Sequence, residues 1–109
     1  MSVVAVIGLG YVGLPLVVEF GKHTRTIGFD IIEDKVARCR AGSDPSREIP
    51  DAEMALAVHA EYTSDPALLR EADFILIAGD RYLRHHEPPS LGLFDVGVHT
   101  IIYIAENET

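Results

Sequence analysis

Continuous apolar runs and helically spaced apolar residues follow one another along this chain. Residues 3–7 and 74–78 are unbroken apolar runs of strand length, as is typical of strands buried on both faces of a parallel sheet. Between them, some apolar residues recur at intervals of one helical turn: Val12, Leu16, Val17 and Phe20. The pattern therefore predicts that strands and helices alternate.

Glycine, proline and short polar residues set the expected ends of these elements. The expected elements are a strand over 3–7, a turn over 8–13, a helix ending at Gly21-Lys22, a strand over 24–29, a helix over 33–40, a loop over 42–50, a helix over 51–59 with Asp51 as N-cap, a strand over 61–63, a helix over 67–71, a strand over 74–78 and a loop over 79–89. Over 91–105 the apolar residues fit a helical face and we expect a helix, although V-H-T-I-I-Y-I also suits a strand.

The alternation predicts an α/β fold: a Rossmann-like doubly wound parallel sheet of about four strands in the order 3-2-1-4. A complete dinucleotide fold has six strands, so we expect a partial one. A fourth strand left uncovered would be an open apolar edge, which invites pairing with a second copy. A homodimer is the partner that this edge suggests.

The turn after the first strand contains three glycines, Gly8, Gly10 and Gly13, spaced G-x-G-x-x-G. In a strand–turn–helix context, the first permits a tight turn, the second lets a pyrophosphate approach the backbone, and the third lets the helix pack closely on the strand. Backbone N–H groups around Tyr11 and Val12 would then hold phosphates at the positive end of the helix dipole. The alternative is a turn with no ligand.

An acidic residue, Asp30, ends the second predicted strand, 17 residues after Gly13. That position suits a carboxylate that accepts hydrogen bonds from the adenosine ribose. A 2′-phosphate would be repelled there, so the sequence favours NAD over NADP as cofactor.

The longer string V-I-G-L-G-Y-V-G-L-P-L, followed by G-F-D-I and K-V, resembles the N-terminal NAD-binding domain of the UDP-glucose/GDP-mannose dehydrogenase family. Further matches are S-R-E-I-P-D-A-E at 46–53 and Y-T-S-D-P-A-L-L-R-E-A-D-F-I-L-I at 62–77. Within that family the chain is most similar to the branch that oxidises UDP-N-acetylhexosamines, the galactosamine and mannosamine 6-dehydrogenases.

The resemblance implies an NAD-dependent oxidation of a sugar C6 hydroxyl to a carboxylate. It also implies the residues that contact NAD: Gly8, Gly10, Tyr11, Val12 and Gly13 at the pyrophosphate, and Asp30 and Lys35 at the ribose. A solvated helix lysine is the alternative for Lys35.

The match ends after Ala78, where Gly79-Asp80-Arg81-Tyr82 stand in place of the V-P-T-P of relatives. The family's nucleophilic cysteine and its UDP-sugar domain lie beyond the length of this chain. We therefore expect residues 1–109 to be the N-terminal portion of an NAD-binding domain, with 79–109 divergent and no catalytic residue. A UDP-sugar would be a partner only if the missing domains were present, and the portion alone is expected to bind NAD weakly without turnover.

Composition and charge exclude some binding partners and favour one cellular compartment. With 17 acidic against 9 basic residues the net charge is −8, which repels nucleic acid and acidic membrane surfaces. Cys39 is the only cysteine, so an intrachain disulfide is excluded. We expect a soluble cytoplasmic protein without a nucleic-acid or membrane partner.

Other residues with reactive side chains are expected to be structural. Cys39 lies in a predicted helix and is expected to be a packed or half-exposed structural thiol rather than a nucleophile. Adjacent histidines, His85 and His86, point apart in a loop, so no metal site is expected there with Glu87 or His99. Asp80 and Arg81 follow a parallel strand and suit either a cofactor contact or a loop salt bridge. Four acidic residues are expected to form a solvated face: Asp44, Asp51, Glu53 and Glu61.

Two other functions remain open. One is a non-enzymatic dinucleotide-binding or assembly module, which the dimer edge would suit. The other is the 6-phosphogluconate and 3-hydroxyacid dehydrogenase group, which shares G-L-G-x-x-G but lacks the G-Y-V-G-L-P and S-D-P matches. It ranks last.

Overall fold

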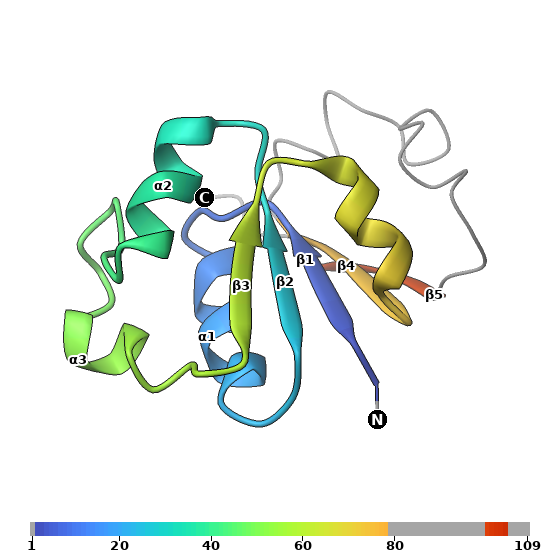
Figure 1. Cartoon of the computed structure of the whole chain (residues 1–109), viewed down its shortest axis with the longest axis horizontal. Helices are drawn as coiled ribbons and strands as arrows, with labels where there is room; N and C mark the ends of the chain where they lie inside the picture. Colours follow the sequence, from blue (N-terminus) through green and yellow to red (C-terminus); the bar gives the residue numbers. More distant parts are fainter. Residues whose placement is uncertain (1, 79–99, 105–109) are drawn as a thin grey trace.

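The computed structural model describes residues 2–78 and the backbone of residues 100–104. Five parallel strands form one sheet in the order β3-β2-β1-β4-β5 (Figure 1). The strands are β1 (Val4–Ile7), β2 (Thr26–Phe29), β3 (Ala60–Thr63), β4 (Phe74–Ala78) and β5 (Thr100–Ile104). The α/β fold class and the order 3-2-1-4 of the first four strands are thus confirmed.

Helices lie on both faces of this sheet (Figure 1). They are α1 (Gly13–Gly21), α2 (Glu33–Arg40), α3 (Asp51–Met54) and the 3₁₀ helix η1 (Pro66–Glu71). Helices α1, α2 and α3 cover one face, and η1 packs on the other. The sheet is therefore the middle layer of a three-layer fold.

Strand β1 supplies core residues to both faces because successive side chains of a strand point to opposite sides. Val4 and Val6 pack with the residues of α1 and α2, whereas Ala5 and Ile7 pack with Leu69 of η1. Ile7 is fully buried, and burial of such a side chain stabilises the fold by about 1.5–3 kcal/mol. The unbroken apolar run that predicted this strand follows from its central place in the sheet.

The C-terminal part of the chain differs from the sequence-based expectation. The helix expected over 91–105 is wrong at Thr100–Ile104, which forms β5 and pairs in parallel with β4. The sheet therefore has five strands instead of about four. Strand β4 is also no open edge, so the argument for a homodimer through that strand does not hold. The expected loop over 79–89 lies outside the described residues.

Two shorter elements also differ from expectation. The helix expected over 51–59 ends at Met54, because the N–H of His59 donates to the Gly21 carbonyl oxygen and the chain turns there into β3. Asp51 is the first helical residue, and Pro50 occupies the N-cap without a side-chain hydrogen bond. The helix expected over 67–71 is the 3₁₀ helix η1, with the Asp65 side chain accepting from the Ala67 N–H at 3.0 Å.

Candidate functional site

The loop that joins β1 to α1 is held at its first glycine by a tight backbone contact. Gly8 has φ of +104°, a conformation that residues with a Cβ rarely adopt, and its N–H donates to the Phe29 carbonyl oxygen at 2.8 Å. The loop therefore starts at the carboxyl ends of the central strands β1 and β2, where open α/β sheets bind their ligands.

Gly13 permits the close approach of α1 to this loop. A Cβ at Gly13 would lie 1.6 Å from the Gly8 carbonyl oxygen and 3.4 Å from the Ala78 Cβ. No shift of a flexible side chain could relieve that clash, since the nearest atom belongs to the backbone. The packing role predicted for the third glycine is confirmed.

Gly10 has no comparable neighbour among residues 2–78. A Cβ added there would meet nothing within 4 Å, and the residue is exposed. The packing of the described residues therefore gives no reason for a glycine at this position. Open space above the backbone is instead what a ligand in contact with the loop would require.

The start of α1 leaves several backbone donors available. Val12 is the N-cap and makes no side-chain capping bond, and the first turn contains no acidic residue. In the described part of the chain, the N–H groups of Tyr11 and Val12 have no acceptor, whereas the Leu14 N–H donates to the Gly10 carbonyl oxygen. Such donors at the positive end of a helix suit an anionic group.

The carboxylate of Asp30 lies directly beside the loop. The side chain is 4% exposed; one oxygen accepts from the Leu9 N–H at 2.8 Å and the other from the Ile32 N–H at 3.0 Å. Each carboxylate oxygen can accept a further bond, because it has two lone pairs. Asp30 thus holds the glycine loop in place and retains acceptor capacity for a hydroxyl.

Lys35 extends this arrangement from α2. Its Nζ lies 3.9 Å from the Asp30 Oδ2, and its side chain is about one third exposed. The site residues predicted from the sequence, from Gly8 to Lys35, therefore lie together at the carboxyl ends of β1 and β2.

Three large exposed side chains flank the loop and Asp30. Tyr11 and Ile31 are each 66% exposed, and Ile32 is 50% exposed. Tyr11 is among the site residues predicted from the sequence, whereas Ile31 and Ile32 are not. The sequence contains a signal for these two residues. Two consecutive isoleucines directly follow the acid that ends a strand, and large apolar side chains are unusual in an exposed loop.

Cys39 is a packed thiol, as expected from the sequence. It is 2% exposed, and burial raises its pKa to about 11, with the Asp44 and Asp30 charges acting in the same direction. Because the thiol stays protonated at neutral pH, Cys39 is not an activated nucleophile.

The expected solvated acidic face is wrong for Asp44, whereas the side chains of Glu53 and Glu61 are 43% and 42% exposed. Asp44 is buried and accepts from three backbone N–H groups and the Ser46 hydroxyl. Glu53 pairs with Lys22 at 2.6 Å, and Glu61 pairs with Arg25 at 2.7 Å. These carboxylates organise loops and join elements.

The remaining candidates lie outside the described residues: Asp80, Arg81, His85, His86, Glu87 and His99. Within residues 2–78, no three His, Cys, Asp or Glu side chains are placed to hold a metal ion. Among the described helices, none is long and apolar enough to cross a membrane.

Comparison with known proteins places this chain in a family. Protein CapL from Staphylococcus aureus is 40% identical over 88 residues, and the UDP-N-acetyl-D-glucosamine 6-dehydrogenase of Pseudomonas aeruginosa is 39% identical over 88 residues. Each match covers 81% of this chain, with 20% of the first protein and 21% of the second. No family model matches the chain.

Solved structures agree on the fold. The UDP-D-ManNAc dehydrogenase of Pyrococcus horikoshii superposes with a TM-score of 0.74 at 19% identity, over 94% of this chain and 28% of that protein. A UDP-glucose dehydrogenase from Pyrobaculum islandicum gives 0.63 at 27% identity, over 73% of this chain and 20% of that protein. The chain spans about a fifth of the length of its curated relatives. By sequence and fold together, it belongs to the UDP-glucose/GDP-mannose dehydrogenase family.

Proposed function

We infer that this chain binds NAD as the dinucleotide-binding part of a nucleotide-sugar 6-dehydrogenase. The observation that carries this inference is the loop at Gly10, where open space above the backbone adjoins N–H donors at the start of α1 that have no acceptor among the described residues. The glycine motif and the family support the same ligand.

The pyrophosphate of NAD would lie on the loop at the N-terminus of α1. The N–H groups of Tyr11 and Val12 would donate to its oxygens, and Gly10 would allow its close approach. Gly8 and Gly13 act indirectly: Gly8 allows the turn, and Gly13 allows the close packing of α1 that places these donors.

The adenosine ribose would lie beside Asp30. Its hydroxyls would donate to the free lone pairs of a carboxylate that Leu9 and Ile32 already orient. Lys35, 3.9 Å from that carboxylate, is positioned to contact the same ribose. A 2′-phosphate would meet the negative charge of Asp30, so NADP is expected to bind more weakly than NAD.

Bound NAD supplies a hydride acceptor for the oxidation of an alcohol. The described residues would provide binding and orientation for it, but the one cysteine of the chain, Cys39, is buried and its thiol stays protonated. We therefore propose that the chain by itself binds NAD without turnover. Oxidation of a UDP-sugar at C6 would require substrate-binding and catalytic parts such as those of the longer relatives.

The test is calorimetric titration of the chain with NAD and with NADP. We expect heat with NAD, weaker binding of NADP, and at least about tenfold weaker NAD binding in Gly10→Ala, because the new Cβ fills the space above the loop. Gly10→Ala is a sharper probe than Asp30→Ala, since Asp30 also holds the loop. No heat from the unmodified chain would overturn NAD binding, whereas equal affinity in Gly10→Ala would overturn the placement of the pyrophosphate on the loop at Gly10.

A further inference from the structure

A second hollow lies along the free edge of β3, apart from the glycine loop. It encloses about 500 Å³ and shares no residue with the candidate NAD site. Its walls come from the end of α2, from α3 with the turn after it, and from η1, and they include Arg40, Met54, Ala57 and Leu68. Its floor is the edge of the strand itself, at Ala60 and Tyr62.

The hydrogen bonds between β3 and β2 show which backbone groups of β3 point away from the sheet. The Thr26 N–H donates to the His59 carbonyl oxygen, and the Asp30 N–H donates to that of Thr63. Since backbone groups alternate along a strand, Ala60 and Tyr62 must turn theirs away from β2. Two bonds on the outer side agree: the Ala60 N–H donates to the Ala57 carbonyl oxygen, and the Arg40 Nε donates to that of Tyr62 at 2.9 Å.

Two outward backbone groups remain without a partner in the described part of the chain. They are the Ala60 carbonyl oxygen and the Tyr62 N–H. An acceptor and a donor two residues apart are what one residue of an added parallel strand would bridge. An antiparallel strand would instead need the Tyr62 carbonyl oxygen, which Arg40 already occupies. The edge therefore favours a parallel partner.

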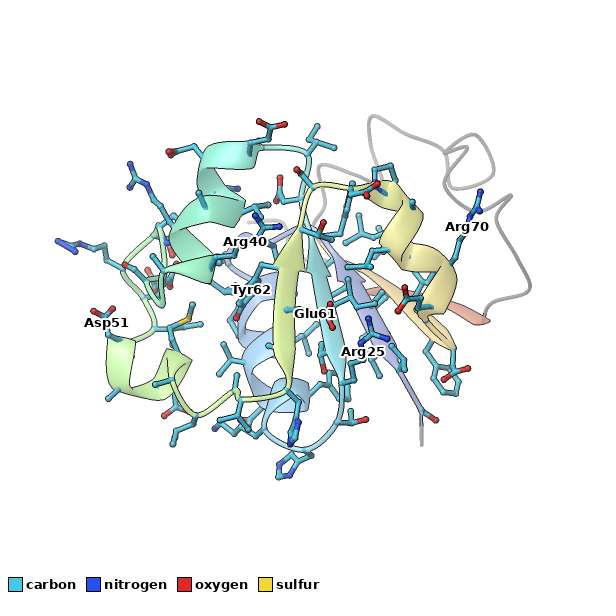
Figure 2. All side chains as sticks on the ribbon, viewed as in Figure 1. Arg25, Arg40, Asp51, Glu61, Tyr62 and Arg70 are labelled. Atoms are coloured by element: carbon cyan, nitrogen blue, oxygen red, sulfur yellow. The ribbon has the colours of Figure 1, made fainter. Side chains whose placement is uncertain are left out.

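Charge at this edge favours an anion at one end of the partner. Figure 2 shows Arg40 and Tyr62 on the α2 side of β3, with Glu61 and Arg25 on the opposite side. The exposed Arg40 uses its Nε on Tyr62, which leaves its Nη groups to donate. Glu61 pairs with Arg25 at 2.7 Å, and Arg25 also pairs with Glu71, so this cluster keeps one net negative charge. It lies on the side of β3 away from Arg40, which leaves Arg40 as the charge next to the hollow (Figure 2).

We propose that this hollow binds the C-terminal residue of an extended peptide. The N–H of that residue donates to the Ala60 carbonyl oxygen, and its carboxylate accepts from the Tyr62 N–H and the Arg40 Nη groups. The penultimate side chain lies on the face of Ala60, towards Met54 and Ala57, because paired strands share their alternation of faces. Main-chain bonds and a charged terminus together define the ligand.

The test is an amide ¹H–¹⁵N NMR titration of the 109-residue chain. The probe is the peptide acetyl-Gly-Ser-Gly-Ser-Val-Ala with a free carboxylate, compared with the same peptide ending in an amide. We expect the Tyr62 amide signal to shift with the acid, and about tenfold weaker binding of the amide, because a charge-assisted bond is lost.

A matched pair of variants isolates the charge. Arg40→Gln keeps a donor for the Tyr62 carbonyl oxygen but removes the charge, and should weaken binding of the acid about tenfold. Arg38 lies on the same helix and pairs with Asp34, so Arg38→Gln should leave binding unchanged. No shift at Tyr62, or equal binding of the acid in both variants, overturns the proposal. Shifts that follow protein concentration without peptide would assign the edge to a second copy and also overturn it.

Discussion

The carboxylate of Asp30 accepts a hydrogen bond from the Leu9 N–H at 2.8 Å, inside the turn that precedes Gly10. One residue thus joins the end of β2 to the glycine loop of β1, in addition to any contact with a ligand. Loss of this carboxylate should therefore change the shape of the loop itself, in addition to removing any contact with a ligand.

Removal of the Asp30 side chain should lower stability as well as NAD affinity. Asp30→Ala leaves the buried Leu9 N–H without its acceptor, and we expect the free energy of unfolding to fall by about 1–3 kcal/mol. Urea unfolding measures the change. Asp34→Ala is the control: its side chain is 76% exposed and pairs only with Arg38 among the described residues, so it should change stability by less than about 0.5 kcal/mol. Equal effects of the two substitutions would contradict the bracing role.

Two glycines of one motif should respond differently to alanine. In Gly13→Ala the Cβ meets the Gly8 carbonyl oxygen, so α1 must move from the loop and stability should fall by about 3 kcal/mol. In Gly10→Ala the Cβ enters open space, and stability should stay within about 0.5 kcal/mol. Thermal unfolding by circular dichroism compares the two. A stability loss in Gly10→Ala as large as that in Gly13→Ala would mean that the loop packs differently.

Acid should loosen the loop around Asp44. Burial alone would raise the pKa of this carboxyl, but hydrogen bonds from Ser46, Ile49 and Glu48 lower it below its ordinary value of 3.8. A lowered folded pKa means that the stabilisation is complete above that ordinary value and is lost as pH falls through the folded pKa.

Urea unfolding between pH 7 and pH 2.5 tests this prediction. Asp44→Asn should be less stable than the unmodified chain at pH 7, and the difference should shrink below about pH 4. Asp51→Asn, at an exposed residue of α3, should follow the unmodified chain throughout. A difference between Asp44→Asn and the unmodified chain that stays constant with pH would contradict the ionised role of Asp44.

The Cys39 thiol should resist alkylation in the folded chain. With a pKa raised to about 11 by burial, little thiolate exists at pH 8, and the sulfur is inaccessible. We expect iodoacetamide to react at least about a hundredfold more slowly than in urea, as measured by mass spectrometry. Labelling at the same rate in both conditions would place the thiol at the surface.

Much of the central sheet could be predicted because its residues carry local signals. The apolar runs of β1 and β4 and the glycine turn between β1 and α1 depend on sequence neighbours alone, as does α2, whose bounds at Glu33 and Arg40 were predicted in full. The place of Asp30 at the end of β2 followed from the same pattern.

Elements whose form depends on contacts with residues distant in the sequence were predicted less well. Residues 100–104 accept either helix or strand by pattern, and pairing with β4 selects the strand. The helix at Asp51 ends early because His59 bonds to Gly21, 38 residues away in sequence. Asp44 looks like a surface acid, yet the loop folds around it.

The sequence by itself determined the α/β class, the strand order of the first four strands and the family, since these depend on periodicity and on a motif whose residues are close together. Only the tertiary structure decided that Asp30 braces Leu9, that Gly10 faces open space while Gly13 does not, and that β3 presents an edge beside Arg40. These features depend on distances between segments, which chain packing sets and a linear pattern does not encode.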